Sequence, residues 1–91
     1  MGNKLFVTIA LKNTMLVHKG IFINDQNLTP AQAGKQMRKE VLPTLNGEWK
    51  PRHLAYAVYE EVRKTYRGLD GSISGHSIDY QIVAKSDNFQ L

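Results

Sequence analysis

The sequence predicts one small α+β domain in which an antiparallel sheet of three to four strands carries two helices on one face. Three observations lead to this prediction. Residues alternate as in strands at both ends of the chain, two helix start signals lie between these segments, and the chain has only 91 residues. Because a second core would leave each half too small to support itself, residues 1–91 are expected to form a single domain. The predicted element order is ββ(β)ααβ.

The first 24 residues are predicted to form an antiparallel hairpin or meander. Residues 4–11 show the period-two pattern of a half-buried strand, with one side formed by Leu5, Val7, Ile9 and Leu11. Residues 14–24 are again rich in β-branched and aromatic side chains. Their one interruption, at Lys19 and Gly20, is either a bulge within one long strand or a turn between two short ones. We prefer the bulge.

The first helix is predicted to begin at Pro30 and to end before Pro43, since the residue preceding a proline is pushed out of the helical region. Thr29 is a favoured N-cap, Pro30 suits the first helical position, and Gln32 completes a capping box. One sector of this helix is apolar and consists of Ala33, Met37, Val41 and Leu45. Gly34 lies on the same sector, although glycine costs about 1 kcal/mol of helix propensity against alanine. We therefore expect a neighbouring element to approach closely at Gly34.

A second helix is predicted over residues 51–67, because Pro51 suits a first helical position and Gly68 a C-terminal cap. Its apolar arc would face the core and contains Leu54, Ala55, Val58, Val62 and Tyr66. Residues 77–85 alternate and predict a closing strand. Since the first strand of a hairpin has a free edge, we expect the closing strand to pair beside residues 4–11 in the middle of the sheet.

The composition excludes several kinds of site. The chain has no cysteine, which removes disulfides, thiolate nucleophiles and zinc–thiolate or iron–sulfur centres and is typical of a reducing compartment. Its longest mostly apolar stretch, residues 5–11, is far shorter than the about 20 residues of a membrane-spanning helix. No signal-peptide cleavage site accompanies this stretch. We therefore expect a cytoplasmic protein without a membrane segment.

A net charge of +4 and an isoelectric point near 9.5 favour a polyanionic partner. The densest positive charge falls on the outer face of the predicted second helix, where a tyrosine lies among arginines. Arginine donors suit phosphate, and a tyrosine ring can stack on a base. With two lysines of the first helix, the predicted nucleic-acid-binding residues are Arg52, His53, Tyr56, Arg63, Lys64, Arg67, Lys35 and Lys39. The alternative is that these charges form ordinary intrahelical pairs and complement the helix dipole.

Residues 68–77 form an unusual segment with three glycines, three serines and a histidine. Glycine amides and serine hydroxyls can bind an anion. A phosphate loop, however, normally precedes a helix so that the helix dipole assists, whereas this segment is predicted to follow a helix and enter a strand. We therefore interpret it as a flexible connector.

Three functions are compatible with these features. The first is a non-enzymatic binding module that contacts nucleic acid through the basic helix face. The second is a protein-interaction regulator or inhibitor of a larger protein, which could form an oligomer or dimer because a free sheet edge invites strand addition. The third is a small ribonuclease that uses His53 or His76 with Glu60 or Glu61 as acid and base, and Arg63 and Arg67 to hold the phosphate. No residue is assigned as catalytic. No cofactor or metal ion is predicted, since the histidines have no partner at ligand spacing.

Overall fold

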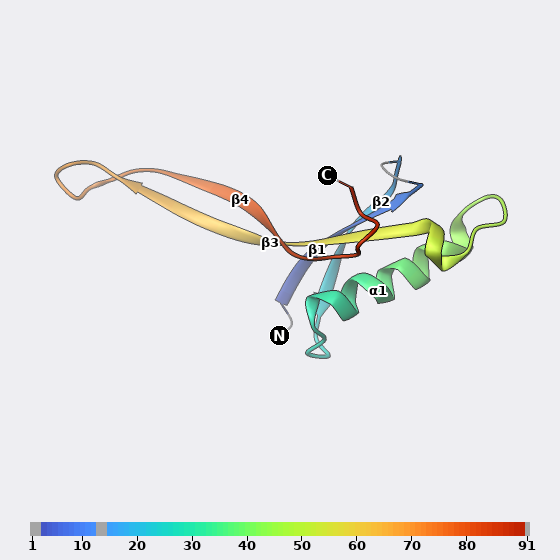
Figure 1. The fold of residues 1–91 in the computed structure, drawn as a ribbon. Coiled ribbons are helices and arrows are strands. Elements are labelled where there is room, and N and C mark those ends of the chain that lie inside the picture. Colours follow the sequence, from blue (N-terminus) through green and yellow to red (C-terminus); the bar gives the residue numbers. More distant parts are fainter. Residues whose placement is uncertain (1–2, 13–14, 91) are drawn as a thin grey trace.

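The computed structural model describes residues 3–12 and 15–90 (Figure 1). Its strands and helix follow one another as β1 (Asn3–Leu11), β2 (Met15–Asn24), α1 (Pro30–Val41), β3 (Leu54–Arg67) and β4 (Ile73–Lys85). Two short 3₁₀ helices lie between α1 and β3, namely η1 (Leu42–Thr44) and η2 (Pro51–His53). The protein is therefore a mixed α+β fold with a four-stranded antiparallel sheet and one helix, where two helices were predicted.

The sheet has the strand order β2–β1–β3–β4, and each neighbouring pair is antiparallel. β1 lies between β2 and β3, and its register pairs Leu11 with Leu54 and Phe6 with Tyr59. The prediction that the last strand pairs beside residues 4–11 is wrong. β3 occupies that edge of β1, and β4 lies on the far side of β3.

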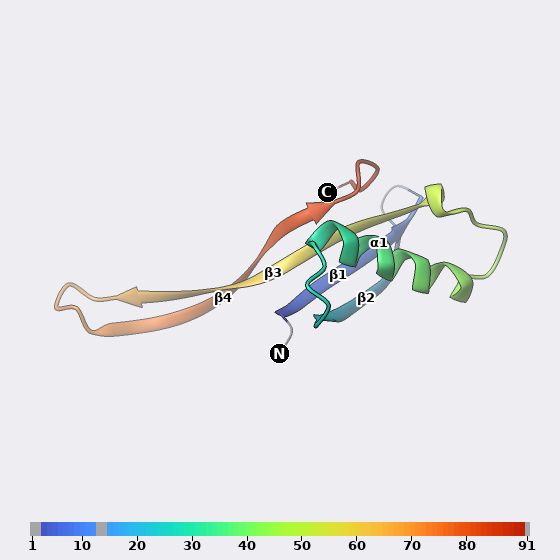
Figure 2. The same ribbon diagram turned by 90° about the horizontal axis from the view of Figure 1, so that it is seen from below.

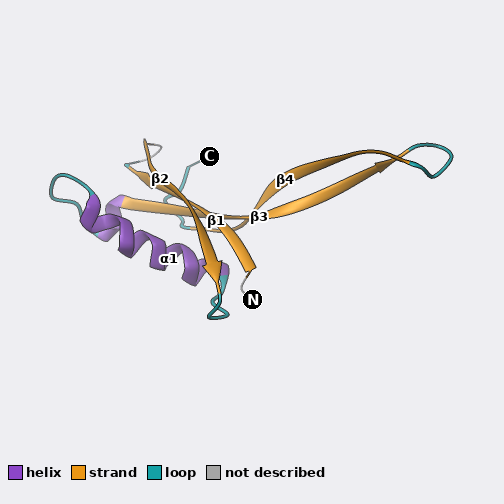
Figure 3. Cartoon of the chain, turned by 180° about the vertical axis from the view of Figure 1, so that it is seen from behind, coloured by secondary structure: helices purple, strands orange, loops and turns teal. Residues whose placement is uncertain are grey.

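The core lies between α1 and one face of the sheet, which we call the helix face (Figure 2). The sheet contributes Leu5, Val7, Ile9, Leu11, Leu54, Tyr56 and Val58 to this core, and α1 contributes Ala33, Met37 and Val41. We call the opposite side the open face, because no helix of the described residues lies on it (Figure 3). There, Phe89 from the C-terminal segment packs over Ala10, Ala55 and Ala57.

The start and the end of α1 agree with the prediction. Thr29 Oγ1 accepts a hydrogen bond from the backbone N–H of Gln32 at 3.2 Å, and Gln32 Oε1 accepts one from the N–H of Thr29 at 2.9 Å. The α-helix ends at Val41, before Pro43. Gly34 is buried where a Cβ atom would overlap the ring of Tyr56. The close approach predicted at Gly34 is therefore confirmed, and the neighbouring element is β3.

The second helix predicted over residues 51–67 is wrong. Only η2 is helical, and residues 54–67 form β3. Residues 54–58 are all buried, because α1 covers one side of this strand and Phe89 covers part of the other. A helix on the surface of a sheet would expose some of these positions, whereas a central strand can bury both of its sides.

The two remaining strands differ from the prediction in their details. β2 is one continuous strand, as preferred, but its bulge lies at Val17 and not at Gly20, since Ile9 pairs with His18 and Ala10 pairs with Leu16. The predicted start of this strand at residue 14 lies outside the described residues. β4 begins at Ile73, which precedes the predicted start at residue 77.

Strands β3 and β4 continue far beyond the rest of the sheet as a two-stranded ribbon (Figure 1). β1 pairs with β3 no further than Tyr59, whereas β3 and β4 pair as far as Arg67. We call residues 60–81 the arm. The molecule measures 60 × 29 × 20 Å, and its Cα radius of gyration is 16.3 Å, against about 12 Å for a compact chain of this length. Among the described residues, no helix has the length and apolar character needed to cross a membrane.

Candidate interaction surfaces

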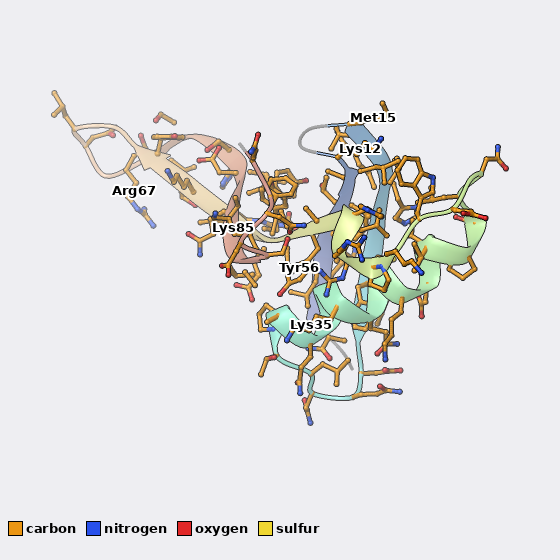
Figure 4. The ribbon with its side chains drawn as sticks, turned by 45° about the vertical axis from the view of Figure 1, so that its right-hand side comes forward. Lys12, Met15, Lys35, Tyr56, Arg67 and Lys85 are labelled. Carbon is orange, nitrogen blue, oxygen red and sulfur yellow. The ribbon has the colours of Figure 1, made fainter. Side chains whose placement is uncertain are left out.

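The eight predicted nucleic-acid-binding residues lie in three separate places, because residues 54–67 form a strand and not a helix. Those near α1 and η2 are Lys35, Lys39, Arg52 and His53. The arm carries Arg63, Lys64 and Arg67. Of these, Arg67 is labelled in Figure 4 and lies far from Lys35. Tyr56 lies in the core, beneath α1. The single basic helix face expected from the sequence therefore does not exist.

The three basic residues of the arm do not share one side of the ribbon. Arg63 and Arg67 point to one side and Lys64 to the other, since side chains alternate along a strand. Lys64 Nζ lies 3.1 Å from Asp79 Oδ2, and the pKa of Lys64 is raised by this hydrogen bond and by the negative charge of Asp79. Arg67 Nη1 donates to the carbonyl oxygen of Gly71 at 3.1 Å. Lys64 and Arg67 thus make contacts within the arm itself.

The segment interpreted as a flexible connector is a hydrogen-bonded turn followed by a strand. The N–H of Gly68 donates to the carbonyl oxygen of Ser72 at 2.8 Å, and the N–H of Gly71 donates to that of Gly68 at 3.0 Å. Asp70 Oδ1 accepts from Ser72 Oγ at 2.6 Å and from Ser72 N at 3.0 Å. Residues 73–77 belong to β4. The turn therefore closes the tip of the arm and connects two strands, whereas a connector between a helix and a strand was predicted.

Basic side chains of α1 gather beside η2. Lys35, Arg38 and Lys39 border a shallow hollow of about 230 Å³ together with Leu42 and Pro51. Arg38 is anchored to the sheet, because its guanidinium carbon lies 5.4 Å from the centre of the Tyr56 ring and its Nη1 donates to the carbonyl oxygen of Leu54 at 3.5 Å. The residue after Pro51 is the exposed Arg52. We call the four cations Lys35, Arg38, Lys39 and Arg52 the basic cluster.

The two histidines considered for a ribonuclease lie in different parts of the fold. His53 Nδ1 accepts a hydrogen bond from the N–H of Lys50 at 2.9 Å in η2. His76 pairs in register with Thr65 on the arm. The strand between Leu54 and Thr65 spans about 37 Å at the usual rise per residue. The described residues also contain no group of three or more histidine, aspartate or glutamate side chains that could hold a metal ion.

The open face carries a mostly apolar hollow of about 600 Å³. Its lining comes from all four strands and from the C-terminal segment, and its large apolar and aromatic members are Phe6, Leu16, Ile21, Tyr59, Tyr80 and Phe89. The rings of Phe6 and Tyr80 pack edge to face with their centres 5.0 Å apart. These side chains point away from α1, because they alternate along the strands with the residues of the core.

Several large apolar side chains on this face are at least half exposed. Leu16, Ile21 and Tyr80 expose 52%, 55% and 55% of their surface. The same side of the sheet continues to Ile23 along β2 and to Ile78 along β4, because residues two apart share a side of a strand. We call these five residues together with Phe6 the apolar strip. Large apolar side chains that lie exposed together on one face mark binding surfaces, so the strip is a candidate binding surface.

Sequence reasoning did not identify the apolar strip, although a signal for it exists. In residues 16–23, Leu16, Ile21 and Ile23 occur on one side of the strand while Val17 and Phe22 contact the core. A strand with apolar residues on both sides needs a covering layer on each. One helix can cover only one face of the sheet, so the other side stays open.

Comparisons of the chain with protein-family models, with curated proteins and with solved structures find no match. Two surfaces of the molecule have the geometry and chemistry of binding sites. One is the apolar strip with its hollow on the open face. The other is the basic cluster beside η2.

Proposed function

We propose that the protein is a small non-catalytic interaction module that binds a protein partner through the open face of its sheet. The observation that carries this proposal is the apolar hollow of about 600 Å³ on that face, bordered by half-exposed aliphatic and aromatic side chains. Leaving apolar surface in water costs about 25 cal/mol per Å², and this free energy is recovered when a partner covers the surface. The strip therefore favours association over a free monomer.

The chemistry of the open face fits a protein better than a polyanion. Among the described residues that line the hollow, Lys19 is the one with a charged side chain. Protein interfaces have an apolar centre enriched in aromatic residues and a polar rim, which is the arrangement of Phe6, Tyr59 and Tyr80 with Lys19 and Gln90. A phosphate-binding surface requires several cations in contact with the ligand. These features support the interpretation of the protein as a protein-interaction module.

Position-specific photo-crosslinking tests the proposal. A photoreactive residue placed at position 21, on the strip, should give discrete adducts in the cells in which the protein is normally made. The matched control is position 66, because Tyr66 is similarly exposed at 53% but lies on the other side of the arm. A Leu16→Lys change should abolish the adducts formed at position 21. Equal adducts at both positions, or none at position 21, would contradict the proposal.

Nucleic-acid binding is a second candidate function, supported by the basic cluster. Lys35 and Lys39 are exposed and lie around one hollow with Arg38, so a phosphate group there could contact several cations. Fluorescence anisotropy with mixed DNA and RNA oligonucleotides at about 50 mM salt, where phosphate contacts are strongest, provides the test. A Lys35→Glu/Lys39→Glu variant should weaken binding and reduce the salt slope by about 2. The matched control is Arg63→Glu/Lys64→Glu on the arm, which should leave binding unchanged. Undetectable binding by the unmodified protein would remove this candidate.

A further inference from the structure

The monomer exposes more surface than its mass requires. Its accessible surface is 6544 Å², whereas a compact monomer of 10.3 kDa exposes about 5,350 Å². The excess is roughly 1,200 Å², and a standard protein interface removes about 800 Å² from each partner. Covering one face of the sheet with one partner of similar size would therefore remove about two thirds of this excess.

The apolar strip extends from β2, where Leu16 and Ile21 line the same hollow as Tyr80, outward along the arm to Ile78. Leu16 and Ile21 lie on β2, at one edge of the sheet, whereas Ile78 and Tyr80 lie on the arm (Figure 1). A surface with two such parts can be self-complementary. Under a two-fold rotation, the arm of one copy covers β2 of the other, and the reverse contact follows by symmetry.

The arm is long enough to make this contact. β3 continues from Glu60 to Arg67 beyond its pairing with β1, which is about 27 Å at the usual rise per residue. The nine residues of β1 span about 30 Å on the same scale. The arm is therefore nearly as long as a strand of the sheet, and it can cover most of the length of β2 in a second copy.

Charge also favours contact between an arm and a sheet of different copies. The arm has a net charge of −1, since its bases are Arg63, Lys64 and Arg67 and its acids are Glu60, Glu61, Asp70 and Asp79. The whole chain has a charge of +4, so the rest of the molecule carries +5. At long range, the basic parts of two copies therefore repel each other, whereas the arm of one copy is attracted to the rest of the other.

From these observations we infer that the occupant of the open face is a second copy of this chain. The two copies form a two-fold dimer, open face to open face, and the arm of each lies across β2 of the other. This arrangement covers Ile78 of one copy and Ile21 of the other in the same contact. The inference rests on the proposed function, because it names the partner of the same face.

Sedimentation equilibrium of the purified full chain tests the dimer. The expected mass at high protein concentration is 20.6 kDa, which is twice 10.3 kDa. Ile21→Lys on the sheet and Ile78→Glu on the arm should each raise the dissociation constant at least ~30-fold, as expected for central interface residues. Both side chains are at least half exposed in the monomer, so circular dichroism should show an unchanged fold. The matched controls are Met15→Lys, on the side of β2 opposite Ile21, and Tyr66→Lys, on the side of the arm opposite Ile78. Both variants should stay dimeric.

A mixture of the two interface variants tests the reciprocal geometry. In each variant homodimer, both arm-to-sheet contacts are damaged. In the heterodimer of Ile21→Lys with Ile78→Glu, one contact is that of the unmodified protein and the other places a lysine opposite a glutamate. The mixture should therefore associate more tightly than either variant alone. A dimer that is insensitive to Ile78→Glu, or a mixture that associates no better than its components, would overturn the inference.

The outcomes separate this inference from the proposed function. A chain that stays monomeric at every concentration, while position 21 crosslinks specifically to a different protein, overturns the dimer and leaves the interaction module in place. A monomeric chain without position-specific adducts overturns both. A 20.6 kDa species that depends on both Ile21 and Ile78 supports both.

Discussion

Gly34 and Tyr56 show how one missing side chain sets the distance between a helix and a sheet. Tyr56 is buried with its ring against Gly34, and the guanidinium carbon of Arg38 lies 5.4 Å from the ring centre. Any larger residue at position 34 would place its Cβ atom in the volume of the ring. The position of α1 over β3 therefore depends on glycine at this position.

Gly34→Ala should lower the free energy of unfolding, because overpacking a core costs about 1–3 kcal/mol. Alanine gains roughly 1 kcal/mol in helix propensity, so the expected net loss is up to about 2 kcal/mol. Urea unfolding followed by circular dichroism measures the change. In a Tyr56→Leu background, where the overlapping ring is absent, the same substitution should be neutral or stabilising. An equally stable single variant would contradict the close contact.

The carboxyl group of Asp70 at the tip of the arm should titrate at lower pH than an ordinary aspartate. Hydrogen bonds from Ser72, first from its hydroxyl and then from its N–H, hold the pKa of Asp70 below its usual value of 3.8. Because the pKa of Asp70 is lowered in the folded state, its carboxylate stabilises the tip at pH values above the usual pKa of 3.8. This stabilisation is lost as the pH falls through the lowered pKa. A carboxyl-carbon NMR titration measures this midpoint. Ser72→Ala should move the midpoint upward, and an unchanged midpoint would contradict the role of Ser72.

At the scale of the elements, β3 shows where local sequence patterns become ambiguous. Leu54, Val58 and Val62 recur every four residues, as in a helix, while Leu54, Tyr56 and Val58 also alternate, as in a strand. Whether these residues form a helix or a strand depends on the rest of the fold. Along one edge of β1, the backbone N–H and C=O groups need hydrogen-bond partners, and residues 54–59 supply these partners. No local pattern contains that information.

Features with local causes were predicted correctly. The capping box at Thr29, the end of the helix before Pro43 and the alternation of β1 all follow from neighbouring residues. The predicted binding residues depended on a helix over residues 51–67, so their grouping failed with that helix. Residues 16–23 indicate a strand with two apolar sides, but which side stays open depends on the strand order and on the number of covering helices.

The capping box of α1 should contribute measurably to stability. Thr29→Ala removes the oxygen that accepts from the N–H of Gln32 and should lower the free energy of unfolding by about 1 kcal/mol. Urea unfolding provides the measurement. Lys35→Ala, an exposed position on the same helix, is the control and should change stability by less than about 0.5 kcal/mol. Equal effects of the two changes would contradict the role of the cap.

At the scale of the whole molecule, the arm makes the monomer elongated. X-ray scattering from the Ile78→Glu variant should give a radius of gyration near the 16.3 Å of the Cα trace. A compact chain of this length would give about 12 Å. A radius of gyration near the compact value would mean that the arm folds back over its own sheet. This result would contradict an arm that extends to a second copy.

The surroundings of Trp49 have a consequence for spectroscopy. It is the one tryptophan of the chain, its Nε1 donates to the carbonyl oxygen of Asn46 at 2.6 Å, and its ring centre lies 5.7 Å from that of His53 and 4.8 Å from Lys12 Nζ. These groups lie at the end of β3 opposite the arm, whereas Tyr66 and Tyr80 lie on the arm itself. Indole emission therefore follows the core alone, whereas phenol absorbance follows both the core, through Tyr56, and the arm, through Tyr66 and Tyr80. A change in phenol absorbance without a change in indole emission reports the arm. The two optical signals can separate melting of the ribbon from global unfolding without an added label.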